Sequence, residues 1–378
     1  MPWNEVSLVE QRQELVLRVL AGEVGVSDFC REVGISRKTA YKWLGRYGSG
    51  SGGWAFDRSR RPHRSPGQTS PDLEALILGV RDDNPAWGGR KIRQVLLNRG
   101  VFPVSSASTI TEVLRRHGRL GVQARGQRDY RRFERERPNE LWQMDFKGSI
   151  GTGSGPCHPL TVIDDYSRYS VCVAACSNER EETVRPVLVS VFRDHGLPEE
   201  ILSDNGSCWG RAESRYTKLG AWFLRLGIKI RHGRAYHPQT QGKNERFNRT
   251  LKAEAISGRE FEDHCDCQLA FDRFRLRYNE ERPHEALGML VPSSRYMVSS
   301  RLYPEVLPAL EYCSGDLVRV VNAGGLLHFR SSFYAVGRAF SGDAVGLRPT
   351  DGDGVYEVYY GWHRVGVLDE GSGRFFQT

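Results

Sequence analysis

Apolar residues recur at helical spacing near the start of the chain, in residues 5–20, 26–33 and 37–47. A period of this kind predicts amphipathic helices. Gly34 provides a tight turn between the second and third segments, and Ser36 is a good N-cap for the third. A helix, a tight turn and another helix are typical of a helix-turn-helix domain, which we predict for residues 1–48. A plain three-helix bundle is the alternative.

The helical period returns in residues 71–120. Three further helices are expected there, over residues 72–81, 89–99 and 107–117. The last one contains a candidate recognition helix, Thr109–Arg116, so we predict a second helix-turn-helix domain. Two such modules in one chain can read a longer DNA site than one module can.

Two polar segments separate these domains from each other and from the rest of the chain. Residues 49–70 are rich in glycine and serine and then in arginine and proline, which predicts a basic linker. Its basic part could also lie along phosphates or in a minor groove. Residues 121–137 are rich in arginine and lack a sustained apolar period. We expect them to form a basic connector.

Alternation replaces the helical period at Leu141–Phe146. Trp142, Met144 and Phe146 form an apolar face, while Asp145 lies on the other face. Two more strands, a helix, a strand ending at Asp204, a helix and a strand follow, over residues 159–163, 169–176, 179–195, 200–204, 216–226 and 227–232. Helices beginning near 242 and at 261 complete the pattern. This order predicts an α/β core with a mixed five-stranded sheet in residues 138–296.

From residue 310 to 378 the chain alternates in six short runs with glycine-rich turns between them. The runs are residues 317–321, 326–329, 333–336, 344–347, 355–360 and 364–368. Short strands at regular spacing predict a small antiparallel barrel.

Composition narrows the class of protein. A chain of 378 residues suits several domains, and no apolar run approaches the length of a membrane span. Eight cysteines without a C-x-x-C spacing are expected to be free thiols in a reducing compartment. We therefore expect a cytoplasmic protein.

Charge is distributed unevenly along the chain. Residues 1–137 carry 25 Lys and Arg against 15 Asp and Glu, a net of +10, while the remainder carries 29 against 31, which together return +8. A basic N-terminal part indicates a nucleic-acid partner. A merely soluble basic region is the alternative.

Three carboxylates are candidates for one metal site. Asp145 lies within a strand, Asp204 ends another strand, and Glu245 lies on the helix that begins near Gly242. If the two strands are neighbours, their carboxylates can meet at one end of the sheet, and the helix brings Glu245 to them. Converging carboxylates repel one another unless hard cations lie among them, and two Mg²⁺ ions serve in-line phosphoryl displacement.

The helix carrying Glu245 has two faces. Glu245, Arg249 and Lys252 share one face, while Phe247 and Leu251 point to the opposite side. An ordinary solvated Glu245–Arg249 pair is the alternative to a functional face.

Asp164 and Asp165 are rival metal ligands for the same site. They stand where a strand meets a turn, a position at which aspartate commonly accepts hydrogen bonds from the backbone. We therefore assign them a structural role.

Several phrases of the sequence together resemble a known family. They are SDNG at 203–206, HPQTQGKNERFNRTLK at 237–252, VIDDYSRY at 162–169 and YNEERPHEAL at 278–287. With Asp145 they resemble the DDE triad of the retroviral-integrase and transposase superfamily, and in particular insertion-sequence transposases of the insertion-sequence-481 family. The resemblance covers about residues 58–292. One departure is that 40 residues separate Asp204 from Glu245, more than is usual in these families.

The resemblance implies a ribonuclease-H-like core, an SH3-like C-terminal barrel and a transposase that binds terminal inverted repeats. It implies DNA cleavage and strand transfer with Asp145, Asp204 and Glu245 as catalytic and metal-binding residues, using two Mg²⁺ ions or Mn²⁺ as a substitute. The implied partners are double-stranded DNA, both element ends and target, and further copies of the chain on DNA as a dimer or tetramer. The resemblance also implies a bacterial, nucleoid-associated protein without a membrane partner.

The alternatives are a non-catalytic DNA-binding regulator derived from such an enzyme and a simple ribonuclease H. Neither is favoured, because a regulator has no use for three carboxylates and a ribonuclease H has none for two helix-turn-helix domains. The candidate DNA-contacting residues are Arg37, Lys38, Tyr41, Lys42, Arg60, Arg61, Arg90, Lys91, Arg115, Lys243, Arg249 and Lys252.

Overall fold

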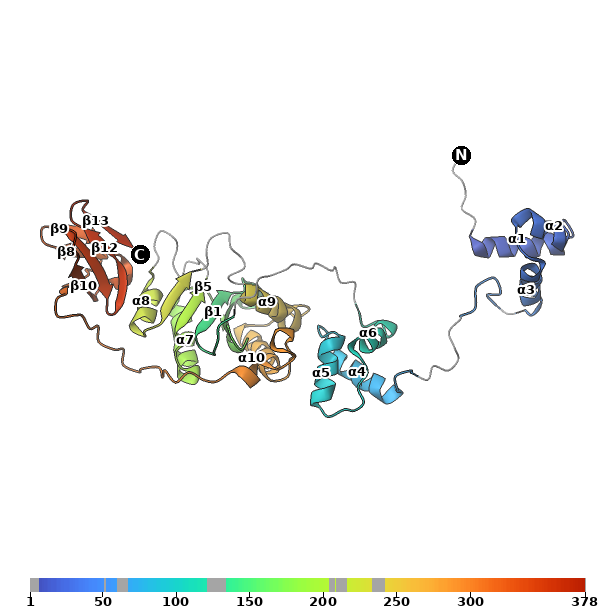
Figure 1. The fold of residues 1–378 in the computed structure, drawn as a ribbon, viewed down its shortest axis with the longest axis horizontal. Coiled ribbons are helices and arrows are strands. Elements are labelled where there is room, and N and C mark those ends of the chain that lie inside the picture. Colours follow the sequence, from blue (N-terminus) through green and yellow to red (C-terminus); the bar gives the residue numbers. More distant parts are fainter. Residues whose placement is uncertain are drawn as a thin grey trace. The chain divides into compact units, whose positions relative to one another are not determined.

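The structure is a computed structural model, and its helices and strands are shown in Figure 1. It describes residues 7–50, 52–59, 67–120, 134–203, 208, 216–232 and 242–377. The chain divides into two compact units, Met1–Gln68 and Thr69–Thr378.

The first unit contains three helices, α1 Leu8–Leu20, α2 Val26–Val33 and α3 Arg37–Gly48. Leu15, Phe29 and Trp43 form its buried centre. Gly34 adopts a left-handed conformation with φ +74°, which ends α2, and the Ser36 side chain accepts a hydrogen bond from the Thr39 backbone to begin α3. The predicted helix, turn and helix are therefore present.

Three more helices open the second unit, α4 Pro71–Asp83, α5 Gly89–Asn98 and α6 Ala107–Arg116. Ile77, Trp87, Ile92 and Ile110 are fully buried between them. Gly89 is required at its position, because any side chain there would collide with the Ala107 carbonyl and Thr111 of α6. The helix-turn-helix arrangement predicted for this segment is confirmed.

A mixed sheet forms the centre of the core. Its strands are β1 Leu141–Phe146, β2 Ile150–Thr152, β3 Gly155–Asp164, β4 Ser170–Cys176, β5 Glu200–Ser203 and β6 Lys229–His232. The order is β2-β3-β1-β5-β6, and β4 also pairs with β3. Strands β1, β3 and β4 are antiparallel, whereas β5 is parallel to both β1 and β6. The predicted five-stranded sheet gains a sixth strand, because the glycine-rich turn after β1 contains the short strand β2.

Helices cover both faces of this sheet (Figure 1). On one face, α7 Glu181–His195 and α8 Lys218–Arg225 pack on Trp142 and Met144 of β1. On the other, α9 Gly242–Leu251 and α10 His264–Glu280 bury Phe247, Phe271 and Phe274 against Ile163 and Val173. A short π-helix, Lys252–Ile256, continues α9. The alternation read at Leu141–Phe146 therefore faces as predicted, with the apolar side chains toward α7.

The C-terminal domain contains a five-stranded sheet and a two-stranded sheet, which one isolated bridge connects. The five-stranded antiparallel sheet has the order β13-β12-β11-β10-β7, and β8 pairs with β9. Leu327 of β8 forms the bridge with Val321, which directly follows β7. The strands are β7 Leu317–Val320, β8 Leu326–Phe329, β9 Ser332–Ala335, β10 Ala344–Pro349, β11 Val355–Tyr360, β12 His363–Asp369 and β13 Arg374–Gln377. The predicted closed barrel is not confirmed, because these sheets remain open. Strand β13 lies beyond the runs that the sequence indicated.

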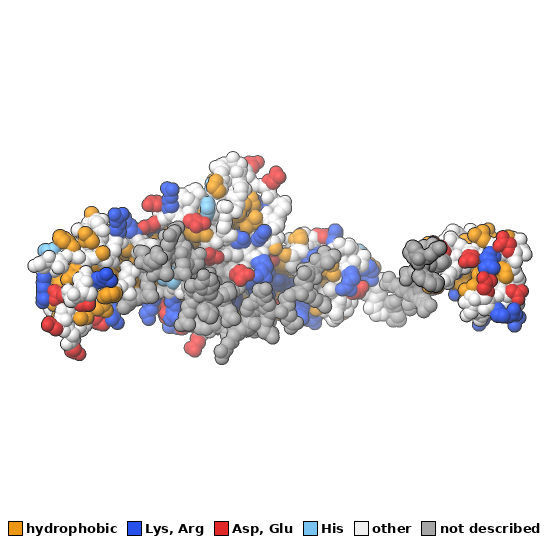
Figure 2. All heavy atoms as spheres, turned by 90° about the horizontal axis from the view of Figure 1, so that it is seen from above, with side chains coloured by type: hydrophobic (Ala, Val, Ile, Leu, Met, Phe, Trp, Pro, Cys, Tyr) orange, Lys and Arg blue, Asp and Glu red, His pale blue; other side chains and the backbone are white. Residues whose placement is uncertain are grey.

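The C-terminal domain packs on the core through α8. Ala221 and Leu224 of that helix belong to the same buried cluster as Phe340 and Tyr360. Hydrophobic side chains also remain at the surface of this domain, among charged ones, at the left of Figure 2. None of the helices in the described part of the chain has the length and apolar composition that a membrane crossing requires.

Candidate active site

Asp145 lies on β1, on the strand face opposite Trp142 and Met144. It pairs with Thr161 of β3, and its backbone carbonyl accepts a hydrogen bond from the Thr161 hydroxyl at 3.0 Å. Its carboxylate accepts a hydrogen bond from the side-chain amide of Asn248 on α9, at 2.9 Å. The side chain of Asp145 is therefore held between the sheet and α9.

Glu245 lies in the first turn of α9 and is exposed. Its carboxylate accepts a hydrogen bond from the Arg249 guanidinium at 2.9 Å. Asp145 and Glu245 line the same open hollow of about 420 Å³, whose other lining residues are Phe146, Lys147, Asn248, Arg249 and Lys252. The structure therefore brings together Asp145, Glu245, Arg249 and Lys252, as the sequence predicted.

The third candidate carboxylate, Asp204, lies outside the described residues. The residue before it, Ser203, is the last residue of β5. Strand β5 is parallel to β1, with Trp142 opposite Ile201 and Gln143 opposite Leu202. The two strands assigned to Asp145 and Asp204 are thus neighbours in the sheet, which meets the condition under which their carboxylates can converge, while the position of Asp204 itself stays a prediction.

Asn248 is a site residue that the sequence analysis did not identify. Its side chain is 7% exposed, and its Oδ1 atom has no hydrogen-bond partner among the described residues. The signal in the sequence was its position three residues after Glu245, which places it one turn further along α9. An amide bound to Asp145 fixes the orientation of that carboxylate in the hollow.

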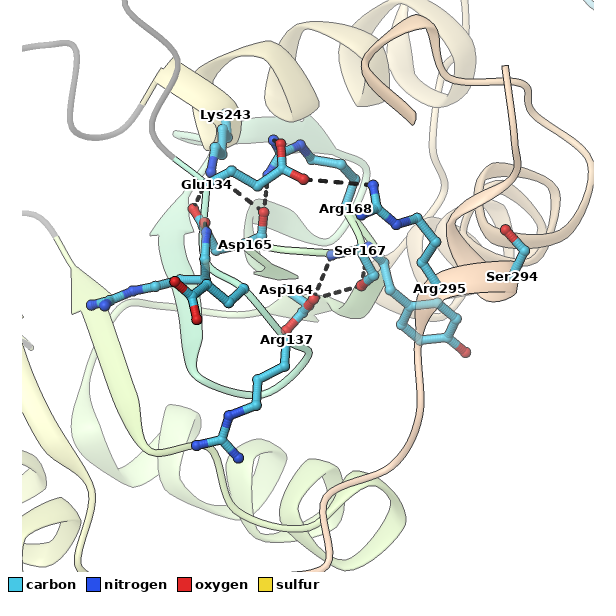
Figure 3. A network of polar contacts seen from close by, with 12 residues as sticks. Glu134, Arg137, Asp164, Asp165, Ser167, Arg168, Lys243, Ser294 and Arg295 are labelled. Atoms are coloured by element: carbon cyan, nitrogen blue, oxygen red, sulfur yellow. Dashed lines mark hydrogen bonds and ion pairs between the residues drawn. The ribbon is translucent and has the colours of Figure 1, made fainter. Parts of the chain in front are cut away.

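Asp164 does not line the hollow. Its carboxylate accepts a hydrogen bond from the backbone of Asn139 at 2.7 Å. It also accepts hydrogen bonds from the backbone and hydroxyl of Ser167 at 2.7 and 2.6 Å (Figure 3). Burial raises the pKa of Asp164, although these hydrogen bonds oppose the shift. The structural role that we assigned to Asp164 agrees with these contacts.

Asp165 is also buried and lies apart from the hollow. Its carboxylate accepts hydrogen bonds from the Gln143 side chain at 2.7 Å and from the Arg135 backbone at 2.9 Å. It also contacts the Lys243 ammonium at 2.5 Å (Figure 3). Lys243 was a candidate DNA contact, and the structure places it in this ion pair. Burial lowers the pKa of Lys243, which Asp165 partly offsets.

The candidate DNA contacts of the first helical module share one surface. Arg37, Lys38, Tyr41 and Lys42 are all exposed on α3, and the Lys42 ammonium also lies 4.7 Å from the centre of the Trp43 ring. Arg60 and Arg61 lie outside the described residues. Figure 2 shows lysine and arginine side chains, in blue, on every coloured part of the surface in view, so they are not confined to the helical modules.

In the second module the candidates have protein partners. Arg90 lies 3.6 Å from Glu285, and Arg115 pairs with Glu112 on its own helix. Burial, and next Arg282, lowers the pKa of Lys91 to about 8. A role in DNA contact for these three residues stays a prediction.

The chemistry of the hollow fits a hard divalent cation. Its two acidic side chains offer carboxylate oxygens, which are the ligands that Mg²⁺ prefers. Within the residues that the structure describes, no group of three or more His, Cys, Asp and Glu side chains could hold a metal ion. Two described carboxylates make an incomplete set, and Asp204 as the third ligand stays a prediction.

Five family models match parts of this chain. Integrase core domain models match residues 135–238 and 226–292, and the model of the IS481 family transposase C-terminal domain matches residues 316–372. A helix-turn-helix domain model matches residues 11–63, and a homeodomain-like domain model matches residues 39–114. These matches support both helix-turn-helix domains and the integrase core.

Similar proteins include two insertion-element products. The chain is 25% identical over 234 residues to the insertion element IS407 uncharacterized 31.7 kDa protein of Burkholderia multivorans, covering 60% of this chain and 82% of that protein. It is 24% identical to the insertion element IS476 uncharacterized 39.2 kDa protein of Xanthomonas euvesicatoria, covering 60% and 65%. Among solved structures, the catalytic core domain of BIV integrase matches at 22% identity and a TM-score of 0.31, covering 41% and 92%.

Proposed function

Because this chain is a DDE transposase of the IS481 type with N-terminal helix-turn-helix domains, we propose that it binds the terminal inverted repeats of a mobile DNA element and catalyses strand cleavage and strand transfer. Its membership makes it a polynucleotidyl transferase that acts in DNA transposition. The proposal concerns the steps of that reaction and the residues that carry them.

One observation carries the proposal. Carboxylates from two separate elements, Asp145 of β1 and Glu245 of α9, line a single hollow that is open to solvent. A phosphodiester of double-stranded DNA can reach a site of that kind, whereas it could not reach a buried one. Asp204 follows β5, the neighbour of β1, and we propose it as the third member of the set.

The reaction that we propose is an in-line displacement at phosphorus. Two bound Mg²⁺ ions, or Mn²⁺ in their place, would supply Lewis acidity for this displacement. Asp145, Asp204 and Glu245 would hold these ions, and Asn248 orients the Asp145 carboxylate through its hydrogen bond. In cleavage, water attacks and a 3′-hydroxyl leaves. In strand transfer, that 3′-hydroxyl attacks a target phosphodiester, and the 3′-hydroxyl of the target strand leaves.

Two basic side chains of the hollow are proposed to hold phosphate. Arg249 and Lys252 line it together with Glu245, and both are exposed. A cation beside the scissile phosphodiester offsets the charge of the DNA backbone. Arg249 pairs with Glu245 in the structure, so DNA or a metal ion would compete for that pair.

Recognition of the element ends is assigned to the helical modules. Arg37, Lys38, Tyr41 and Lys42 present one exposed face of α3, the geometry with which a recognition helix enters a major groove. We propose that Arg60 and Arg61 contact phosphates or a minor groove, and that Arg90, Lys91 and Arg115 contribute from the second module. A homo-oligomer on DNA is expected, because strand transfer must handle two element ends.

The test of chemistry uses the full chain and DNA carrying the element ends. We expect Asp204→Asn and Glu245→Gln each to abolish cleavage and strand transfer while end binding stays near wild type. Activity should require Mg²⁺ or Mn²⁺. Asp194→Asn, an exposed carboxylate on α7, is the matched control and should cleave normally. Cleavage by either site variant above a few per cent of wild type would remove that residue from the triad.

The test of recognition compares end DNA with random DNA of equal length. Arg37→Ala or Lys38→Ala should weaken end binding by about 1–3 kcal/mol if the residue contacts a base edge. A residue that contacts only phosphate would weaken binding to both DNAs alike. Equal affinity of the wild-type chain for end and random DNA would contradict the assignment. End binding without any metal-dependent cleavage would instead identify a DNA-binding regulator.

A further inference from the structure

Asp165 is a fully buried carboxylate that joins three segments of the core. It lies just after β3 and accepts hydrogen bonds from Gln143 of β1 and from the Arg135 backbone. It also binds the ammonium of Lys243 at 2.5 Å, and that side chain is only 18% exposed. Figure 3 shows Lys243 reaching Asp165 from α9. The reaction described above uses none of these groups.

The two partners of Asp165 stand close to the candidate catalytic carboxylates. Gln143 precedes Asp145 by two residues on β1, so both side chains lie on the same face of that strand. Lys243 precedes Glu245 by two residues, in the first turn of α9. The Asp165 side chain therefore links the strand of one carboxylate to the helix of the other.

The position of Lys243 is unfavourable for a lysine on local grounds. The first turn of a helix carries a partial positive charge and stabilises anions, so a cation there opposes the helix dipole. Burial adds a desolvation cost to a charged ammonium. The Asp165 carboxylate offsets both effects, which gives α9 a strong preference for the one placement in which the pair forms.

We propose that Asp165 and Lys243 are a positioning pair, which fixes the start of α9 on β1 and so sets the distance between Glu245 and Asp145 at which metal is held. This inference rests on the proposed function of the hollow. Phe247 and Leu251 pack α9 on the sheet, and Asn248 ties the second turn of the helix to Asp145. The ion pair to a buried carboxylate adds a directional constraint at the first turn, where Glu245 lies.

Contact with DNA is the competing role for Lys243. Its ammonium is engaged by Asp165, with both the carboxylate at 2.5 Å and the Asp165 carbonyl at 3.4 Å. Lys243 is also absent from the residues that line the hollow, in contrast to Arg249 and Lys252. The two roles predict different results when Lys243 is changed. A positioning role predicts a loss of metal affinity, whereas a DNA contact predicts a loss of DNA affinity.

The experiment compares full-length Lys243→Met, Asp165→Asn, the double variant and Lys243→Arg. Three quantities are measured for each: Mn²⁺ affinity from the electron paramagnetic resonance signal of free Mn²⁺, the Mg²⁺ dependence of end cleavage, and affinity for end DNA. For Lys243→Met we expect about tenfold weaker Mn²⁺ binding and ~10–100-fold slower cleavage, because small misplacements of catalytic groups have effects of that size. End-DNA affinity should change by less than about twofold, since no phosphate contact is removed.

The effects of the Lys243 and Asp165 changes on Mn²⁺ affinity should not be additive, and this is a more specific expectation than the effect of either change alone. The double variant should lose no more Mn²⁺ affinity than the worse single variant, because either change already breaks the pair. Lys243→Arg, which keeps the charge, should recover most of the loss. Arg193→Met is the matched control, since it removes an exposed ion pair with Glu305 on α7 and should leave all three measurements unchanged.

Three results would overturn the positioning role. They are normal Mn²⁺ affinity in Lys243→Met, additive losses in the double variant, and a loss of end-DNA affinity with metal binding intact, which would assign Lys243 to DNA. If Lys243→Met does not fold, Gln143→Met removes the link to β1 without unpairing a charge and should weaken Mn²⁺ binding in the same direction; unchanged binding in that variant overturns the inference.

Glu245→Gln in the same assays separates this inference from the proposed function. If Glu245→Gln keeps normal Mn²⁺ affinity and cleavage, the proposed site itself is wrong. If Glu245→Gln loses both while Lys243→Met and Gln143→Met lose neither, only the positioning role fails.

Discussion

Helix α9 carries two acid–base pairs that differ in their surroundings. Lys243 pairs with Asp165 of another segment, and the two side chains are 18% and 0% exposed. Arg249 pairs with Glu245 of the same helix, at 73% and 66% exposure. The distances are similar, 2.5 and 2.9 Å, so solvent access rather than geometry distinguishes the two pairs.

The difference shows how one helix can serve both the fold and the chemistry. A buried pair loses its hydration on folding and becomes costly to break, whereas an exposed pair is screened by water and contributes little to stability. Breaking the pair between Glu245 and Arg249 therefore costs little free energy, so Glu245 can bind a metal ion and Arg249 can bind a phosphate. Lys243 and Asp165 cannot, and they hold the helix while that exchange takes place.

The largest expected effect on stability comes from a second buried ion pair, which lies outside α9. Arg282 pairs at 3.0 Å with Glu254 of the π-helix that continues α9, and both side chains are 10% exposed. We expect Arg282→Met to lower the free energy of unfolding by about 3–5 kcal/mol, because it leaves Glu254 buried without its partner. Urea unfolding of the full chain measures the change.

A double variant serves as the control for this prediction. Arg282→Met with Glu254→Met removes both charges, so it should recover much of the stability that the single change loses. A single variant as stable as wild type would show that the pair is solvated in solution, and the contrast between buried and exposed pairs would then fail for this part of the core.

A smaller effect concerns pH. Burial, and next Arg282, lowers the pKa of His284 to about 2, and the Arg282 guanidinium donates to the His284 ring at 3.4 Å. In the unfolded chain the ring has a pKa near 6.5, so between these values the unfolded state binds more protons. The neutral His284 ring therefore makes its full contribution to the free energy of unfolding above pH 6.5, and this contribution is lost as the pH falls. We expect about 1 kcal/mol less stability at pH 5.5 than at pH 7 from this residue.

The pH effect is measured by urea unfolding at the two pH values. His284→Phe should remove most of that difference, whereas His328→Phe, at an exposed position in the C-terminal domain, should keep it. An unchanged pH dependence in His284→Phe would mean that folding does not lower the pKa of this ring, contrary to its buried surroundings.

On the exposed side, Lys252 tests the role of the hollow in DNA contact. Lys252→Ala should reduce cleavage of end DNA and flatten its salt dependence by about one counterion. Its effect on the free energy of unfolding should stay under ~0.5 kcal/mol, because the side chain is exposed. Cleavage at the wild-type level over the whole salt range would exclude the phosphate contact.

The smallest expected effect is on the Arg249–Glu245 pair itself. Arg249→Ala should change the free energy of unfolding by no more than about 0.3–0.5 kcal/mol, the usual contribution of an exposed pair at this helical spacing. Thermal unfolding in low and high salt checks this value. A loss of several kcal/mol would show that the two pairs of α9 are energetically alike, and the comparison would have no basis.

Much of the architecture could be predicted from the sequence. The helical period identified α1 to α6, and alternation at Leu141–Phe146 identified β1 and the faces of Trp142 and Asp145. These elements form because periodicity and capping act between residues a few positions apart. The hollow containing Asp145 and Glu245 followed from the same patterns together with the family resemblance.

Other features could not be predicted from these patterns. The sheets of the C-terminal domain stay open, although six alternating runs indicated a barrel, because alternation specifies strands and not their pairing. Asn248 was missed because an asparagine on a helix is ordinarily a surface residue, and its value comes from the contact with Asp145 across the fold.

The local sequence determined which residues of α9 share a face, and it placed Glu245, Arg249 and Lys252 together correctly. Only the tertiary structure decided that Lys243 belongs with Asp165, from which it is separated by 78 positions in the chain. Charge alone made Lys243 resemble the other basic residues of that helix. Burial gave it a different role, because the desolvation that governs an ion pair depends on everything packed around it.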